Sequence, residues 1–386
     1  MQPNGYFVNV KKNAEQLRLL IAAGGTGGHI TPALAVYECL KERLGSDLHV
    51  QWIGSDNRLE STLVPSYGIP FTPMPIRGFS GVFSTASLQL PFRLLKSFTI
   101  AKNLIKSFQP HIVLATGAYI SYPVGKAAGA LGVPLVLMES NVNVGKSNQQ
   151  LLSTATYIAL SYDATLEYVP RNLRQKAEVV GNPVRRAVLR LPAREAACKS
   201  LGFKVDAPVV VVMGGSLGAR SINNAIQNMI SKWETEGKAP FQILWQTGTT
   251  FKPVVPETLK PFIVHTSFIG EVGQAYAAAD VVLCRSGATT IAELCVAEKP
   301  AVLVPLPSAS MNEQYLNARM LAQAGAARVV TDEELESKVE SILLEMIRSE
   351  DLTLMSKALQ QFAKPDAAET IANAVIRIAN EKGRRG

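Results

Sequence analysis

The chain contains the same three-part pattern twice: an apolar run of strand length, a glycine-rich loop and a segment with helical spacing. The first copy begins at Leu17 and reads LRLLIAA, GGTGGH, ITPALAVYECLKERL; the second begins at Ala207 and reads APVVVVM, GGSLGARS, INNAIQNMISKW. The first loop glycines, Gly24 and Gly214, are 190 residues apart. Because strand–loop–helix units build parallel sheets, the repeat predicts two doubly wound α/β domains.

Further apolar runs follow each copy and alternate with helical patterns, as α/β folds require. They are LHVQWIG, HIVLATG and VPLVLME in the first half, and FQILWQTG, DVVLCRSG and AVLVPLP in the second. A length of 386 residues suits two domains, and the join is expected near GNPVRRAV at 181–188. Ligands of such folds bind at the carboxyl ends of the strands, so we expect the site in a cleft between the domains.

Cysteine and histidine usage indicates neither a disulfide framework nor a zinc site. The four cysteines form no CxxC pair and the four histidines are scattered, which is typical of a protein of the reducing cytoplasm. The polar N-terminus is unlike a signal peptide, and no apolar run approaches the length of a membrane span.

The net charge of +8 is unevenly placed, since no Asp or Glu occurs between Glu60 and Glu139. The same stretch carries the basic residues Arg77, Arg93, Lys96, Lys102, Lys106 and Lys126. Its centre, LQLPFRLLKSFTIAKNLIKSF, has near-helical apolar spacing and predicts either a basic amphipathic helix on an anionic membrane or an ordinary helix packed inward. No nucleic-acid-binding motif accompanies it, so no nucleic-acid partner is expected.

The sequence matches neither of two standard phosphate-binding motifs, the dinucleotide fingerprint and the P-loop. GGTGGH lacks the third glycine of the dinucleotide fingerprint because residue 30 is Ile30, and the second loop also lacks the spacing. GKS at 145–147 ends like a P-loop, but Ser140 stands at its first glycine position. The sequence therefore disfavours a nicotinamide enzyme and a P-loop enzyme.

Two interpretations of the glycine-rich loops remain: general phosphate-binding loops, or strand-to-helix turns that bind no ligand. Glycine-rich turns at helix N-termini expose N–H groups and the positive end of the helix dipole. The second loop adds Ser216 and Arg220, and the turn CRSGATTIAE places Glu293 where it could accept from a ribose diol or only complement its helix dipole. No DxD occurs, so no metal or cofactor is expected, and helix dipoles and amides would stabilise a leaving diphosphate.

Six motifs in order resemble one family. GGTGGHITPALAV, the ESN of MESNVNVGKSNQ, GNPVR, GGSLGARSIN, CRSGATTIAE and NEQYLNA closely resemble the MurG family of bacterial peptidoglycan N-acetylglucosaminyltransferases, from about residue 18 to about 370. The resemblance implies a GT-B fold of two Rossmann-like domains. It also implies inverting transfer of N-acetylglucosamine from UDP-GlcNAc to the C4 hydroxyl of lipid I (undecaprenyl-diphosphate-linked MurNAc-pentapeptide), giving lipid II.

The resemblance also implies a location and partners. We expect a peripheral enzyme on the cytoplasmic face of the bacterial plasma membrane that contacts anionic lipid, lipid I and other cell-wall synthesis proteins. The implied domains are an acceptor- and membrane-facing domain at 17–184, a donor domain at 185–365 and a C-terminal helix at 366–386 that packs back on the first domain. Residues 1–16 are expected to be a mobile extension.

The family's site residues transfer to matching positions. The implied donor-binding residues are Thr26, Gly27, Gly28, Asn141, Arg185, Ser216, Ile269, Ala288, Thr289, Thr290, Ile291, Ala292, Glu293 and Gln314. Within this set Ile269 would lie beside uracil, Glu293 on the ribose and Gln314 on the sugar hydroxyls. The implied acceptor-binding residues are Gly117, Tyr119 and Ser121.

His29 is the expected base, or an orienting group, for the attacking hydroxyl, because imidazole titrates near neutral pH. A purely structural role in the turn is the alternative, and Glu139 is the rival base. Three segments depart from the family pattern: Met138 and Ser140 around Glu139, the loop TGAYISYPVGK, and Glu313 where a second glutamine is common.

Three other functions stay open at this stage. They are a related GT-B transferase with another lipid-linked or small acceptor, a UDP-GlcNAc 2-epimerase, and a non-catalytic nucleotide-sugar or membrane-scaffold subunit.

Overall fold

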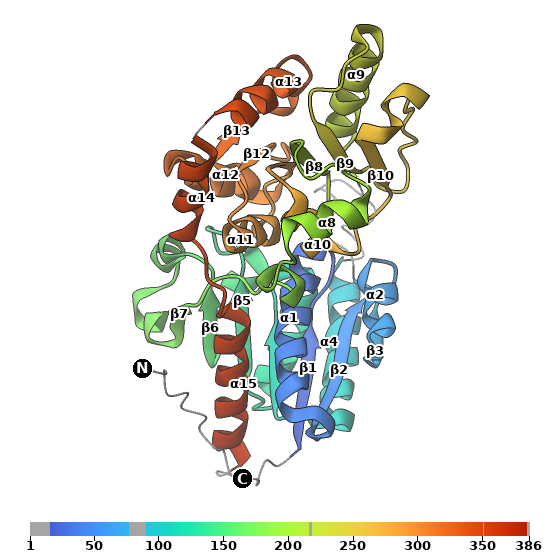
Figure 1. The fold of residues 1–386 in the computed structure, drawn as a ribbon. Coiled ribbons are helices and arrows are strands. Elements are labelled where there is room, and N and C mark those ends of the chain that lie inside the picture. The colour runs from blue at the N-terminus through green and yellow to red at the C-terminus, as the bar shows by residue number, and fades with distance from the viewer. Residues whose placement is uncertain (1–15, 77–89, 216–217, 350, 384–386) are drawn as a thin grey trace, which may run out of the picture.

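The structure, a computed structural model, describes residues 16–76, 90–215, 218–349 and 351–383. Figure 1 shows two α/β domains, one above the other, with the last helix running down alongside the lower domain. The expected mobile extension, except residue 16, lies outside the described residues, as do Arg77 of the basic stretch and Ser216 of the second glycine loop.

The first domain is built on a seven-stranded sheet in which every neighbouring pair is parallel. In spatial order its strands are β3 (Phe71–Met74), β2 (Leu48–Ser55), β1 (Leu17–Ala22), β4 (Ile112–Ala115), β5 (Leu135–Glu139), β6 (Tyr157–Leu160) and β7 (Ala177–Val179). The order reverses between β1 and β4, and the loops that follow these two strands therefore open the crevice where doubly wound folds bind ligands.

Helices cover both faces of this sheet. They are α1 (Gly27–Leu44), α2 (Glu60–Ser66), α4 (Leu90–Phe108), α5 (Ala118–Ala130) and α6 (Lys146–Gln149). Short 3-10 turns span Gly45–Asp47, Asp163–Tyr168 and Arg171–Lys176. Because parallel strands are buried on both faces, β1 is apolar from Leu19 to Ala22: Leu19 and Ile21 point into one core, Leu20 and Ala22 into the other.

The second domain repeats the plan with six parallel strands. Their order is β10 (Ile263–Thr266), β9 (Gln242–Gln246), β8 (Val209–Met213), β11 (Val281–Cys284), β12 (Ala301–Leu303) and β13 (Ala327–Val329). Its helices are α7 (Arg186–Leu189), α8 (Arg194–Leu201), α9 (Arg220–Glu236), α10 (Val272–Ala278), α11 (Ala288–Ala297), α12 (Glu313–Gln323), α13 (Asp332–Arg348) and α14 (Asp351–Gln360). Its 3-10 turns span Glu257–Phe262 and Ser310–Asn312.

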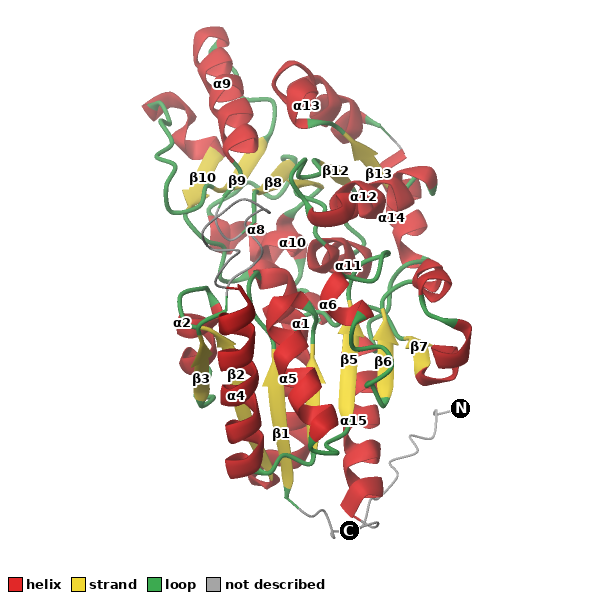
Figure 2. Ribbon diagram, turned by 180° about the vertical axis from the view of Figure 1, so that it is seen from behind, coloured by secondary structure: helices red, strands yellow, loops and turns green. Residues whose placement is uncertain are grey.

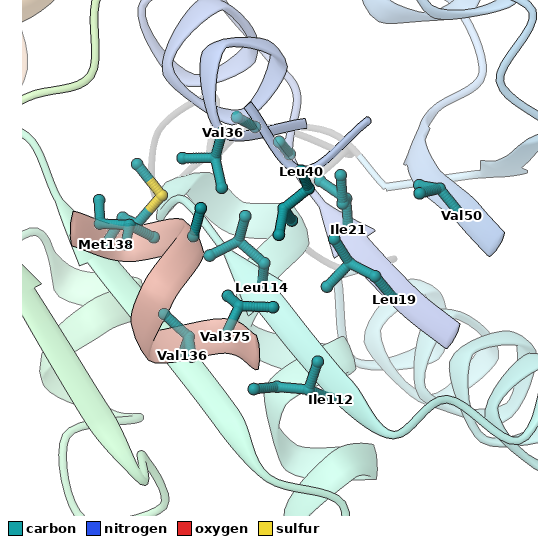
Figure 3. Close-up of a cluster of buried hydrophobic side chains, with 14 of the residues drawn as sticks. Leu19, Ile21, Val36, Leu40, Val50, Ile112, Leu114, Val136, Met138 and Val375 are labelled. Atoms are coloured by element: carbon teal, nitrogen blue, oxygen red, sulfur yellow. The ribbon is translucent and has the colours of Figure 1, made fainter. Parts of the chain in front are cut away.

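The final helix, α15 (Ala367–Gly383), returns to the first domain. Figure 3 shows Val375 of α15 beside Leu114 of β4 and Val136 of β5, and Ile371 and Ile378 belong to the same buried cluster. The apolar side of α15 thus packs on the same face of the sheet as α1.

The basic segment centred on residue 98 forms α4, which with α5 covers the opposite sheet face (Figure 2). Ala101 and Ile105 are buried and Phe98 and Leu104 pack against the same core, so this part of the helix is an ordinary core helix. Near its start, Phe92 is 77% exposed and Leu95 66% exposed. None of the described helices combines the length and apolarity needed to cross a membrane.

Candidate active site at the domain junction

The first glycine loop ends in the first turn of α1, which brings His29 to the carboxyl edge of the sheet. Its Nδ1 lies 2.8 Å from the carbonyl oxygen of Thr116, the residue that follows β4. Because a carbonyl only accepts, Nδ1 carries the hydrogen, and in the neutral ring Nε2 holds the lone pair. Burial lowers the pKa of His29 below its usual 6.5, partly offset by the Thr116 bond and the charge of Glu60. His29 is therefore neutral at physiological pH and suited to accept a proton.

Glu60 is a site residue for which the sequence analysis gave no role. It is fully buried at the start of α2, and its Oε1 accepts from Gly25 N–H (2.9 Å) and Ser55 N–H (3.0 Å). A Cβ at Gly24 would lie 2.1 Å from this oxygen, so glycine is required there. Oε2 has no partner among the described residues. The Gly25 N–H of the first loop is thus bonded to the Glu60 carboxylate, whereas the N-terminus of α1 is not.

Glu139 lies at the end of β5 and is buried. Its carboxylate accepts three hydrogen bonds: from Asn141 N–H (3.0 Å), Gly145 N–H (2.9 Å) and Asn148 Nδ2 (2.8 Å). Burial raises its pKa, and these bonds act against the rise. The bonds fold residues 139–148 into a fixed turn that also positions the main chain of Asn141.

The three expected acceptor residues surround the start of α5. A Cβ at Gly117 would lie 3.4 Å from Cε1 of His29, which places this glycine against the imidazole edge. The Tyr119 hydroxyl is 3.2 Å from Ser55 Oγ, and its ring lies close to Gly25. The Ser121 side chain is buried, and its hydroxyl donates to the Gly117 carbonyl.

In the second domain, three elements meet at Glu293. Arg185, in the segment that joins the domains, donates to Oε1 of Glu293 from Nε (3.1 Å) and Nη2 (2.9 Å). Tyr276 of α10 donates to Oε2 (3.0 Å). Tyr276 is fully buried, and nothing in the sequence analysis indicated its part in the site.

The remaining expected donor residues border the same edge of the second sheet. Gly287 caps α11, whose first turns hold Ala288, Thr289, Thr290, Ile291 and Ala292. Ile291 points into the core, whereas the Thr289 and Thr290 side chains are partly exposed. Ile269 belongs to the same buried core and donates its N–H to Gln246 Oε1 (2.9 Å). Gln314 Oε1 accepts a hydrogen bond from Leu306 N–H (3.0 Å).

The two domains touch directly at these loops. Thr289 Oγ1 donates to the Gly28 carbonyl across the junction (3.1 Å), and Asn182 Nδ2 reaches Thr289 Oγ1 at 3.5 Å. Glu313 begins α12; burial and the charge of Glu139 raise its pKa to about 7. The N-termini of α1 and α11 therefore converge on one place, with His29 beside it. No His, Cys, Asp or Glu cluster of metal-binding size occurs among the described residues.

Two Rossmann-like domains whose helix N-termini meet at the junction define a GT-B glycosyltransferase architecture. The N-terminal domain of glycosyltransferase family 28 matches residues 19–160, and the C-terminal domain of that family matches residues 209–371.

Relatives cover almost the whole chain. A protein of Bacteroides fragilis named UDP-N-acetylglucosamine--N-acetylmuramyl-(pentapeptide) pyrophosphoryl-undecaprenol N-acetylglucosamine transferase is 35% identical, covering 97% of this chain and 98% of its own. A protein of the same name from Salinibacter ruber is 36% identical, covering 94% and 97%. The crystal structure of Acinetobacter baumannii MurG superposes with a TM-score of 0.71 at 27% identity, covering 94% of this chain and 99% of its own. The chain belongs to the MurG family of glycosyltransferase family 28.

Proposed function

We propose that this chain transfers N-acetylglucosamine from UDP-GlcNAc to the C4 hydroxyl of the muramoyl sugar of lipid I, with inversion at the anomeric carbon, to give lipid II. The observation that carries the proposal is the similarity, over 94–97% of the chain, to transferases of that name. The structure supports the proposal because the neutral imidazole of His29 lies where the helix N-termini of both domains converge.

In the proposed reaction His29 Nε2 removes the proton of the C4 hydroxyl as that oxygen attacks C1 of the donor sugar. The bond between C1 and the diphosphate oxygen breaks, and its electron pair leaves with UDP. The Nδ1 hydrogen bond to Thr116 holds the ring and supports the imidazolium that forms. Glu139 is the weaker candidate for this step, because three donors already hold its carboxylate in the 139–148 turn.

The departing diphosphate gathers negative charge that the second domain can stabilise. The N-terminus of α11, with the Thr289 and Thr290 hydroxyls, offers amide hydrogens and a positive dipole end. Glu293 would accept from the ribose, Ile269 would contact uracil and Gln314 would contact the sugar. Ser216, Asn141 and the 26–28 segment complete the proposed donor site.

We also assign the first domain to the acceptor and to the cytoplasmic face of the plasma membrane. Phe92 and Leu95 project from the start of α4, and Lys96 and Lys106 on the same helix are exposed. Apolar side chains among cations suit an anionic bilayer surface. Gly117 and Tyr119, which lie near His29 and the first loop, would contact lipid I, and other cell-wall synthesis proteins are the expected neighbours there.

The test is turnover of the purified chain with UDP-GlcNAc and a short-chain lipid I analogue in EDTA. We expect release of UDP together with a product heavier by one N-acetylglucosamine unit in β linkage. Donor binding without transfer would remove the acceptor assignment. Conversion of UDP-GlcNAc without any acceptor would instead support the epimerase, and no donor binding would overturn the proposal.

A further inference from the structure

Strand β9 ends between two segments of the proposed donor site, and its last residue is Gln246. In the second sheet β9 lies between β8 and β10 (Figure 1). The second glycine loop follows β8, and the segment 267–269, which contains the expected uracil contact Ile269, follows β10. Gln246 is only 5% exposed. Its side chain is therefore buried at the carboxyl edge of the sheet, where the two segments come together.

The side-chain amide of Gln246 bonds to both segments. Its Oε1 accepts from the Ile269 N–H (2.9 Å), and its Nε2 donates to the Gly215 carbonyl (2.8 Å). The first partner can only donate and the second can only accept, so a carboxamide matches both at once. An ionised carboxylate would lack the donor, and an apolar side chain would lack both groups. One side chain thus links the glycine loop to the 267–269 segment.

The glycine loop also lies against the main chain that follows Gln246. A Cβ at Gly218 would lie 2.4 Å from the Thr247 carbonyl oxygen, so glycine is required there. The Gly215 carbonyl accepts a second hydrogen bond, from the Gly218 N–H (3.0 Å). The Thr247 N–H in turn donates to the carbonyl of Thr266, the last residue of β10 (2.9 Å). A shift of the loop would therefore disturb its contacts with both Gln246 and Thr247.

The other end of β9 carries a second glutamine with the same kind of bonding. Gln242 is 1% exposed; its Oε1 accepts from the Lys204 N–H (2.7 Å), and its Nε2 donates to the Lys204 carbonyl (2.9 Å). Lys204 precedes β8, so these bonds lie at the edge of the sheet opposite to the one where doubly wound folds bind ligands. The two glutamines share a strand, burial and bonding, and they differ in the edge at which they lie.

We propose that Gln246 is a positioning residue that couples the two halves of the donor site. Its amide holds the glycine loop, which would contact the diphosphate, in a fixed relation to the 267–269 segment, which would contact the base. Because ordering loops costs free energy on binding, this fixed relation favours a ligand that spans both halves. The inference rests on the proposed function, since it takes a uridine diphosphate sugar as the ligand.

The experiment measures dissociation constants of the full chain for uridine and UDP by calorimetry. The dissociation constant of uridine divided by that of UDP gives the gain in affinity from the diphosphate. Gln246→Met removes both hydrogen bonds at similar side-chain length, and Gln242→Met does the same at the other edge. We expect the ratio to fall by about tenfold in Gln246→Met and to stay within about twofold in Gln242→Met. A loss of folding stability alone would not change the ratio.

Gln246→Asn is a milder second variant, which keeps the amide but is shorter by one methylene group and so reaches only one of the two partners. We expect it to lower the ratio by about threefold to tenfold. An unchanged ratio in the Gln246 variants, or an equal fall in Gln242→Met, would overturn the positioning role while leaving UDP binding in place. If the unaltered protein binds no UDP, the proposed function fails and this inference fails with it.

Discussion

A buried carboxylate beside the proposed catalytic imidazole has two effects at once, and Glu60 illustrates both. Its Oε1 holds the Gly25 and Ser55 amides, which fixes the loop that leads to His29. Its charge also raises the pKa of His29 against the lowering effect of burial. A base needs both a free lone pair at working pH and enough basicity to take a proton, so this balance suits the proposed role.

The substitution Glu60→Gln tests that balance. Removing the charge should lower the pKa of His29 further, so the acid limb of the kcat/KM profile should move to lower pH. The plateau should fall because the imidazole becomes a weaker base. The measurement is a pH–rate profile beside Glu195→Gln, which alters an exposed carboxylate on α8. An acid limb that stays in place or moves to higher pH would contradict the electrostatic role.

At the residue scale, the sequence predicts features that depend on neighbouring residues in the chain. It does not predict hydrogen bonds between residues that are far apart in the chain. The GGTGGH loop places His29 at a helix start, and the order of six motifs indicates the family. Glu60 bonds to Gly25 across 35 residues, and Tyr276 bonds to Glu293 from a different helix. An acidic residue at the start of a helix and a tyrosine within one are common, so only the folded chain reveals these hydrogen bonds.

At the scale of elements, α4 confirms the expectation of an inward-packed helix, whereas contact with a membrane stays a proposal. Helical spacing gives it one apolar side, and most of that side packs against β-sheet core residues. The first turns extend beyond the core and leave Phe92 and Leu95 exposed. Periodicity predicts the helix but not how far along its length the core reaches, because that depends on the neighbouring α5.

We expect the double substitution Phe92→Ser and Leu95→Ser to weaken binding to phosphatidylglycerol-containing vesicles by at least about tenfold. Each large apolar side chain contributes up to about 1.5–3 kcal/mol when it leaves water. The free energy of unfolding should change little, because both side chains are exposed. Vesicle sedimentation measures the binding, with Leu354→Ser, at an exposed leucine of α14, as the control. Equal binding by the double variant and the control would remove α4 from the membrane surface.

At the scale of the whole molecule, the two domains are tied at their junction and again by α15. The strand–loop–helix repeat predicts both sheets, since each parallel strand must be apolar on both faces. It does not predict the relative placement of the domains, which depends on single contacts such as Thr289 to Gly28 and on the approach of Glu313 to Glu139.

Glu313 makes the junction sensitive to pH. Its pKa of about 7 lies above the usual value, so the folded state retains a proton that the unfolded state loses. The stabilisation is full below about pH 4.5 and disappears as the pH rises through about 7. Glu313→Gln should therefore raise the melting temperature at pH 8 by about 1–3 °C and change it little at pH 5. Thermal unfolding beside the exposed control Glu167→Gln checks this, and an equal shift at both pH values would contradict it.

The most direct test of the account is kcat for His29→Gln at pH 8 with UDP-GlcNAc and the lipid I analogue, since the central claim is proton removal at the junction by His29. We expect kcat to fall by about 10²–10⁴ while the dissociation constant for UDP-GlcNAc stays within about twofold. The control His49→Gln, at an exposed position on β2, should retain full turnover. Turnover of His29→Gln within a few-fold of the unaltered protein would contradict the account and return the role of base to Glu139.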